Sequence, residues 1–248
     1  QVANINGYSS FICNLSAEPD RAYYLQLLHE KRVDGIIIAT SHITDDQLVR
    51  VLREEVSLVL INREMNGIPS VCTDSELGGW MATCHLVDTG HRVIGYIGVP
   101  PSVKSGIQRK KGYERALRER RLPLVPGLIM EEENSADGGH RAATALLASS
   151  RRGSAVFVYD DVMAIGAIRA IQEAGLSVPG DMAVVGYDDI AIAAHVTPPL
   201  TTVRQAKELM GIKAMQLLLA LMAGENAADN HVMLRPELIV RESSSARV

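Results

Sequence analysis

The sequence predicts an α/β protein with parallel sheets, and three observations support this fold class. Short apolar runs rich in β-branched residues, such as 34–39 (DGIIIA) and 154–158 (SAVFV), alternate with amphipathic helical patterns. These runs are apolar throughout, as expected for strands that are covered on both faces of a sheet. Helix signals stand between them: Asp160 or Asp161 can cap a helix that would end at Gly175. The alternation therefore indicates strands joined by helical crossovers.

The same pattern predicts the elements in order. The expected strands are 9–14, 34–39, 57–61, 93–98, 127–130, 154–158 and 182–187. The expected helices are about 18–31, 44–54, 75–89, 106–121, 136–149 and 161–174. After Pro198-Pro199 we expect a short strand at 200–203, one long helix over about 204–223 and an extended segment at 232–242. Because an α/β unit opens with a strand and residues 1–7 resemble the end of a helix, we also expect a first strand to be missing ahead of Gln1.

Composition limits the classes of protein that fit. The chain has 248 residues, enough for one large domain or two lobes, and a formal net charge of −4. A domain that grips a phosphate backbone is normally basic, so this chain is not expected to bind DNA by itself. The three cysteines, Cys13, Cys72 and Cys84, lie far apart in apolar runs and read as reduced residues of a cytoplasmic protein. No apolar stretch is long enough to span a membrane, and the first ten residues do not resemble a signal peptide.

Motifs for catalysis or metal binding are not found in the sequence. It has no GxSxG, HExxH, Walker or GxGxxG pattern, so we expect no enzyme and no cofactor. Cys84, His85, Asp88 and His91 have a superficial likeness to metal ligands. His91, however, follows Thr89-Gly90, which should end the helix that carries the other three. We therefore interpret this group as a polar helix end and expect no metal.

Polar side chains follow several of the expected strands. In open parallel sheets ligands bind beyond the carboxyl ends of the strands. Asp188, Asp160 and Asn62 stand just beyond three such strands, and Arg109 lies in the connection and helix that follow a fourth. Carboxylates that accept and guanidinium groups that donate suit the hydroxyls of a sugar or a small polar ligand. We expect Arg109 and Asp188 to face a water-filled cleft, where neither should matter much to the ligand-free fold.

Simpler explanations exist for the same carboxylates. Asp160 can be a helix cap, with or without a ligand contact. Asp188 and Asp189 can initiate a turn, although for Asp188 we favour the ligand role.

Several segments resemble a known family. They are "GHRVIGYIG", "RKKGYERAL", "VFVYDDVMAIGAIRAIQEAGLSVPGDMAVVGYDDI", "PPLTTVRQ" and "RPELIVRESS". In sequence and order they resemble the effector-binding core of LacI/GalR-type bacterial transcriptional regulators, and the likeness covers nearly the whole chain. It implies two Rossmann-like lobes of the periplasmic-binding-protein-like type I fold, three interlobe crossovers, and a small effector between the lobes. A helix-turn-helix domain that precedes such cores is absent from this chain, so contact with DNA would pass through that domain.

The resemblance also assigns roles to residues. It implies that Asp188 and Arg109 are the principal ligand contacts, that Asp160 stands where the family often has Asn, and that Asn62 reaches the ligand from the first lobe. Ser105 and Asn134 complete the expected ligand-binding set. Asn134 falls near the place where some relatives have an aromatic platform, so the ligand class of those relatives is not carried over.

The expected organisation follows from the same likeness. We expect lobe one to comprise 1–74 plus 204–227 and lobe two 75–203 plus 228–248, with crossovers near Asp74, Arg204 and Asn230. We expect a homodimer formed through the helix after Asp161 and the loop 190–197.

Two functions remain open at this point. The leading hypothesis is the effector-sensing and dimerisation core of a cytoplasmic regulator that binds a sugar or sugar derivative and has no membrane partner. Purines and phosphorylated sugars are other ligands of related cores, and Arg63 and Lys207 leave an anionic ligand open. The alternative function is a periplasmic sugar-binding protein of a transport system.

Overall fold

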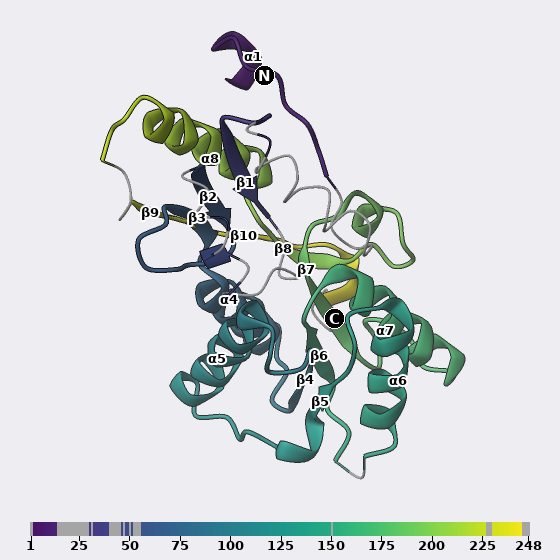
Figure 1. The fold of residues 1–248 in the computed structure, drawn as a ribbon. Helices are drawn as coiled ribbons and strands as arrows, with labels where there is room; N and C mark the ends of the chain where they lie inside the picture. The colour runs from purple at the N-terminus through teal and green to yellow at the C-terminus, as the bar shows by residue number, and fades with distance from the viewer. Residues whose placement is uncertain are drawn as a thin grey trace. The chain divides into compact units, whose positions relative to one another are not determined.

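The computed structural model places the chain in two compact units. Unit 1 comprises Gln1–Thr73 and Ala206–Leu234, and unit 2 comprises Asp74–Gln205 and Arg235–Val248. Within them the structure describes residues 2–13, 30, 32–39, 46, 48–49, 51, 56–149, 151–226 and 230–244. Figure 1 labels the helices and strands of both units. No helix among these residues has the length and apolar character needed to cross a bilayer.

Unit 1 contains a parallel sheet of four strands. The order is β1 (Gly35–Ile38), β2 (Ser57–Ile61), β3 (Ser70–Thr73) and β9 (His231–Leu234). One face is covered by α8 (Lys207–Met222), whose Met210, Ala214 and Leu218 pack on Val59 and Val71. The short helix α1 (Val2–Ile5) contacts α8. The alternation of side chains along the strands thus gives unit 1 a core on each face of its sheet.

Three expectations for unit 1 need correction. Residues 9–13 form no strand, and Phe11 and Ile12 are exposed, because no strand in the described part of the sheet pairs with them. Strand β3 was not expected, since its four residues give little periodic signal. The third crossover lies between Leu234 and Arg235 and not near Asn230, because β9 pairs in register with β3.

Two further expectations concern helices of unit 1. The helix expected at 18–31 lies almost entirely outside the described residues. In the range 44–54, residues 46, 48, 49 and 51 are helical, and the rest of that range is not described.

Unit 2 contains a larger sheet of six strands. Its order is β10-β8-β7-β6-β4-β5. The strands are β4 (Ile94–Gly98), β5 (Ile129–Glu131), β6 (Ala155–Val158), β7 (Ala183–Asp188), β8 (Thr201–Arg204) and β10 (Glu237–Ile239). All neighbours are parallel except β10, which is antiparallel to β8. The expected α/β class with parallel sheets is confirmed.

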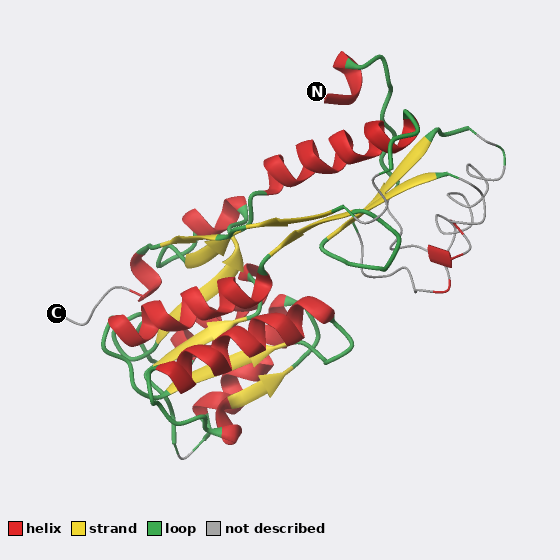
Figure 2. Ribbon diagram, turned by 90° about the vertical axis from the view of Figure 1, so that its left-hand side faces the viewer, coloured by secondary structure: helices red, strands yellow, loops and turns green. Residues whose placement is uncertain are grey.

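Helices cover both faces of the unit 2 sheet, as Figure 2 shows. Helices α4 (Ser75–Asp88) and α5 (Lys104–Glu119) cover one face. Helices α6 (Ala136–Leu147) and α7 (Asp161–Glu173) cover the other. Along β6, Phe157 packs toward the first pair and Val156 and Val158 toward the second. Burial on both faces explains why these strands are apolar throughout.

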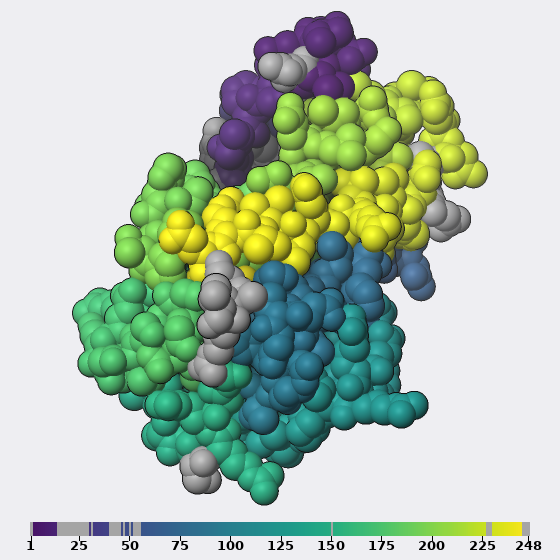
Figure 3. All heavy atoms as spheres, turned by 180° about the vertical axis from the view of Figure 1, so that it is seen from behind, coloured from purple at the N-terminus to yellow at the C-terminus, as the bar shows by residue number. Residues whose placement is uncertain are grey.

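The C-terminal residues complete unit 2. After β10 the chain forms the turn η3 (Glu242–Ser244), which contacts β7 and β8. Within this turn Glu242 is exposed, whereas Ser243 and Ser244 are buried. Figure 3 shows the yellow C-terminal segment beside the blue residues of α4. The contact is specific, because His85 of α4 and Ser244 are 2.7 Å apart at Nε2 and Oγ.

Candidate functional site

The order of strands in unit 2 creates a switch point between β4 and β6. From β4 the chain passes to β5 on one side, and it then returns to β6 on the other side of β4. Successive connections therefore leave the two neighbouring strands in opposite directions, and ligands of doubly wound sheets bind at such points beyond the carboxyl ends. Arg109 lies on the helix after β4, Asp160 stands two residues beyond the end of β6, and Asp188 ends β7.

Arg109 is buried among aromatic rings. The residue is 4% exposed, and its guanidinium carbon lies 4.4 Å from the ring centroid of Tyr159 and 3.6 Å from that of Tyr187. Its Nη1 donates to the backbone oxygen of Tyr159 at 2.5 Å. Helix α5 can approach α4 closely at this point, because a Cβ on Gly79 would collide with the Arg109 carbonyl oxygen. Stacking and hydrogen bonding together fix the guanidinium group.

Asp188 is the charged partner of this guanidinium. Arg109 Nη2 lies 3.2 Å from Asp188 Oδ1, and the side-chain amide of Gln205 donates to the same oxygen. Burial lowers the pKa of Arg109, but the charge of Asp188 and the neighbouring tyrosines outweigh this effect and raise it overall. Asp188 Oδ2 accepts no hydrogen bond from any described residue, and the Asp188 side chain is 25% exposed. One carboxylate oxygen is therefore left to accept a hydrogen bond.

Asp160 acts as the N-cap of α7. Its Oδ1 accepts from the backbone N–H of Met163 at 2.8 Å, so the cap interpretation is confirmed. The residue is 5% exposed, and burial raises the pKa of its carboxyl group. The exposed residue Asn134 lies close enough to hydrogen-bond this side chain. A ligand contact of Asp160 remains a prediction.

Ser105 reaches the same group of residues through Tyr159. Its Oγ lies 2.9 Å from the hydroxyl oxygen of Tyr159. Tyr159, Tyr187 and Gln205 were not among the expected site residues, although each stands at the end of a strand. Aromatic residues make up only 4% of the chain, yet two of the seven tyrosines enclose Arg109.

Asn62 lies in unit 1. It follows β2 with a backbone φ of 54°, and its Oδ1 accepts from the backbone N–H of Thr73 at 3.2 Å. A side-chain amide that bonds a backbone donor and tolerates the left-handed region is typical of Asn at a strand end.

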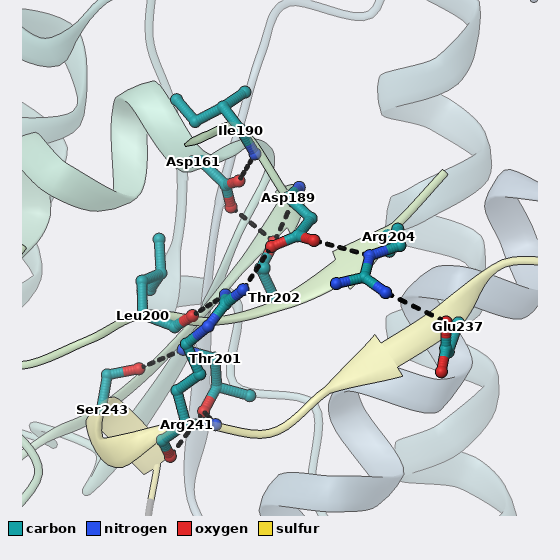
Figure 4. A network of polar contacts seen from close by, with 10 residues as sticks. All are labelled: Asp161, Asp189, Ile190, Leu200, Thr201, Thr202, Arg204, Glu237, Arg241 and Ser243. Atoms are coloured by element: carbon teal, nitrogen blue, oxygen red, sulfur yellow. Dashed lines mark hydrogen bonds and ion pairs between the residues drawn. The ribbon is translucent and has the colours of Figure 1, made fainter. Parts of the chain in front are cut away.

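Asp189 is bound by two arginines. Its carboxylate accepts from Arg204 Nε at 2.6 Å and from Arg241 Nη2 at 2.7 Å, as Figure 4 shows. Burial acts to raise the pKa of Asp189, but the hydrogen bonds from Arg241 and Arg204 outweigh it and lower the pKa. The adjacent carboxylates Asp188 and Asp189 thus have separate sets of partners.

The expectation that Arg109 faces a water-filled cleft is wrong. Two rings and a carboxylate cover its guanidinium group. Removing Arg109 should therefore affect the ligand-free fold, contrary to what the sequence suggested.

The residues with a superficial likeness to metal ligands have other contacts. Helix α4 ends at Asp88, and Gly90 has a φ of 99°. Asp88 pairs with Arg120 at 2.9 Å, and His91 Nδ1 lies 2.8 Å from Ser154 Oγ. Across the described part of the chain no cluster of three or more His, Cys, Asp or Glu residues is placed to hold a metal ion.

Comparison with known proteins gives a consistent set of relatives. The model of the periplasmic binding protein-like domain matches residues 83–244. The repressor PurR of Mannheimia succiniciproducens is 34% identical over 241 residues, which are 96% of this chain and 72% of that protein. PurR of Aliivibrio fischeri is also 34% identical, over 98% of this chain and 74% of its own length.

Solved structures of regulators have the same fold. The transcriptional regulator CelR in complex with cellobiose matches with a TM-score of 0.90 and 32% identity, over 98% of this chain and 76% of that one. A regulator from Enterococcus faecium with bound ribose matches with a TM-score of 0.87 and 26% identity, over 100% of this chain and 91% of that one.

Proposed function

Because this chain belongs to the LacI family of bacterial transcriptional regulators and carries its periplasmic-binding-protein-like effector-binding core, we propose that it binds a sugar or sugar derivative through unit 2. The observation that carries the proposal is the pair Arg109–Asp188 at the switch point of the sheet. Its open carboxylate oxygen is an acceptor, and sugar hydroxyls are donors.

The ligand contacts follow from exposure. Asp188 is more exposed than Arg109, at 25% against 5% of the side chain, so we propose that Asp188 touches the effector and that Arg109 orients it. Asp160, Ser105 and Asn134 are proposed as further contacts around the same edge. For unit 1 the proposal rests on the family resemblance alone and names Asn62.

A sugar is favoured over other ligands by two kinds of support. The carboxylates near Arg109 outnumber it, which suits neutral ligands with hydroxyl donors better than phosphorylated ones. Two similar regulators were solved with cellobiose and with ribose. Nucleobases are the second class to test, because the relatives named PurR are as similar in sequence.

The proposed mechanism is a shift between conformations of the whole regulator. An effector that binds two conformations with different affinity changes their populations, and the change would alter the affinity for the DNA operator. DNA would be contacted by a helix-turn-helix domain outside this chain, and such a regulator acts in the cytoplasm. The relatives are regulators and not enzymes, and they do not favour a transport protein.

We also propose a two-fold dimer that uses α7 and the turn η2 (Ala191–Ala194). Val162 and Ile192 support it, since they are 40% and 50% exposed on these elements. Ile192→Glu should shift the protein toward monomer in sedimentation velocity, while Val240→Glu, at another exposed apolar position of unit 2, should not.

The function is tested by a binding screen. Thermal shift with ribose, cellobiose, phosphorylated sugars and nucleobases identifies the class, and calorimetry then gives the affinity. We expect Asp188→Asn to weaken binding of the effector so found. Glu76→Gln, which removes another carboxylate that pairs with an arginine of α5, serves as the control. Equal affinity of parent and Asp188→Asn would contradict the proposed contact.

A further inference from the structure

The turn after β7 has an unusual backbone. Asp188 has a φ of 104° and Asp189 a φ of 46°, so two consecutive residues other than glycine lie at positive φ. A side chain makes this region unfavourable, and such conformations persist only where surrounding contacts impose them. The contacts that impose this turn therefore also determine where the Asp188 carboxylate points.

Asp161 supplies contacts to the turn from α7. The residue is fully buried, and its Oδ2 accepts from the backbone N–H of Ile190 at 2.9 Å. Its Oδ1 accepts from the hydroxyl of Thr202 at 2.5 Å, and Thr202 Oγ1 accepts in turn from the backbone N–H of Asp189 at 3.3 Å. Figure 4 shows this arrangement. The backbone N–H of Ile190 is thus bound directly by the Asp161 carboxylate, and that of Asp189 is linked to it through the Thr202 hydroxyl.

Gly186 of β7 leaves space for the Asp161 carboxylate, because it has no side chain. A Cβ added to Gly186 would collide with Asp161 Oδ1, and its next neighbour would be Leu200 Cδ2 at 3.1 Å. Gly186 is therefore required by the close approach of Asp161 to the strand.

The side chain of Asp189 is held separately. Arg241 binds it and also donates to the Leu200 carbonyl oxygen at 2.7 Å. Arg204 binds it from the end of β8, two residues before the chain enters unit 1 at Ala206. With both Asp189 oxygens bound to arginines, Asp188 is the carboxylate of this turn that faces Arg109 and Gln205.

We propose that Asp161 is a positioning residue for the effector site. Its buried carboxylate fixes the turn 188–190, and the turn aims Asp188 at Arg109. Asp161 itself does not touch the effector. The link to effector binding rests on the proposed function, but the positioning of Asp188 exists in the ligand-free protein and is tested there.

The test is a double-mutant cycle on unfolding of the ligand-free chain in urea. The variants are Asp161→Ala, Asp188→Asn and their combination. If Asp161 aims Asp188 at Arg109, the loss of unfolding free energy caused by Asp188→Asn should fall to about half or less in the Asp161→Ala background. A purely structural role of Asp161 predicts the same loss in both backgrounds, and that result would overturn the proposal.

Two matched variants serve as controls for the double-mutant cycle. Ser135→Ala removes the hydrogen bond that the backbone N–H of Gly138 donates to Ser135 Oγ, at the start of another helix of unit 2. In that background the effect of Asp188→Asn should be unchanged. Asp161→Asn keeps an oxygen for Ile190 N–H and an amide that can donate to Thr202, so it should retain most of the effect.

A milder variant covers the case in which Asp161→Ala does not fold. Thr202→Val keeps the shape of the side chain and removes only the hydroxyl that joins Asp161 to Asp189 N–H. Exchange of the Asp189 and Ile190 amide hydrogens should then become about tenfold faster, while amides of β4 keep their rates. Unchanged exchange at both amides, together with an undiminished effect of Asp188→Asn, would refute the role of Asp161.

The outcome separates this proposal from the proposed function. If the cycle shows coupling but Asp188→Asn binds the effector like the parent, Asp161 positions Asp188 and the assigned contact is wrong. If Asp188→Asn loses binding and the cycle shows no coupling, the contact stands and the positioning role is wrong.

Discussion

Asp188 and Asp189 are adjacent residues of one type, yet they differ in their surroundings. The side chain of Asp189 is 10% exposed, and each of its oxygens is bound by an arginine. The side chain of Asp188 is 25% exposed, and only one of its oxygens is engaged by described residues. A carboxylate with both oxygens engaged is committed to the fold, whereas one with an open oxygen can still bind a ligand. Two neighbouring acids at a strand end can thus divide structure and recognition between them.

The partners of the two carboxylates differ in the same way. Arg109 is buried between two rings, while the side chain of Arg204 is 46% exposed. Breaking a buried charge pair is costly because a desolvated charge is left behind, and exposed pairs contribute little. Asp188, the proposed ligand contact, is therefore paired with the more deeply buried arginine, which holds its carboxylate in place in the ligand-free protein.

The largest expected effect is that of Arg109→Ala on stability. The substitution removes the stacking on Tyr159 and Tyr187 and the hydrogen bond to the Tyr159 carbonyl oxygen. We expect a loss of about 3 kcal/mol or more in the free energy of unfolding, measured in urea without ligand. Arg204→Ala is the matched variant on the other carboxylate, and its loss should be about 1 kcal/mol or less. Equal losses would remove the distinction between the two partners.

The next effect concerns the effector. A charge-assisted hydrogen bond contributes about 1.5 to 3 kcal/mol, so Asp188→Asn should weaken effector binding about tenfold to a hundredfold. Asp189→Asn should change the affinity by less than about threefold, because both Asp189 oxygens are already bound by arginines. Calorimetry well below the melting temperature separates affinity from stability. A larger loss for Asp189→Asn would reverse the assignment of the two acids.

A third difference appears in the pH dependence of stability. Burial raises the pKa of Asp161 from 3.8 to about 7, whereas the pKa of Asp189 is lowered. Between pH 3.8 and about 7 the folded protein therefore holds a proton on Asp161 that the unfolded chain has lost. The contribution of Asp161 to stability is fully present below about pH 3.8 and is lost as the pH rises toward 7. For Asp189 the contribution is present above 3.8 and is lost as the pH falls through the lowered value.

Asp161→Asn should reveal this difference. The parent should gain stability relative to the variant as the pH is lowered from about 7 to about 4.5, measured as the difference in melting temperature. Comparing parent and variant cancels groups that do not interact with Asp161, such as His85, whose pKa is lowered by burial. Asp189→Asn, by contrast, should show no such trend in this window. A constant difference for Asp161→Asn would mean that Asp161 stays ionised throughout.

Much of the fold was predictable because its signals are local. The strands β4, β6 and β7 are continuous apolar runs, and caps such as Asp160 and the left-handed Gly175 mark the helix between them. Pairings between distant segments leave no local signal. Strand β9 pairs with β3, which lies about 160 residues earlier in the sequence. Because of this pairing, the chain leaves unit 1 after Leu234 and not near Asn230. The strand expected at 9–14 failed for the same reason, since β propensity without a pairing partner does not form a strand.

The positions of the candidate site residues were predictable, but the burial of Arg109 was not. Arg109, Asp160 and Asp188 could be chosen from their positions after three strands, and the structure brings them to one edge of the unit 2 sheet. The burial of Arg109 depends on Tyr159 and Tyr187, which lie 50 and 78 residues away in sequence. The sequence also does not show which of the two adjacent aspartates is bound by arginines. Arg204 and Arg241 lie in segments that are distant from Asp189 in the sequence.

The smallest expected effect is at the outer end of the Asp189 network. Arg204 Nη1 lies 3.5 Å from Glu237 Oε2, and the two side chains are 46% and 68% exposed. Water competes for both groups and salt screens them, so Glu237→Gln should change the free energy of unfolding by no more than about 0.5 kcal/mol. The change should vanish in high salt, whereas the loss caused by Asp189→Asn should persist because the Asp189 side chain is only 10% exposed. If Glu237→Gln cost as much as Asp189→Asn, the arginine would depend on its outer partner, and the commitment of Asp189 to the fold would not come from its own two ion pairs.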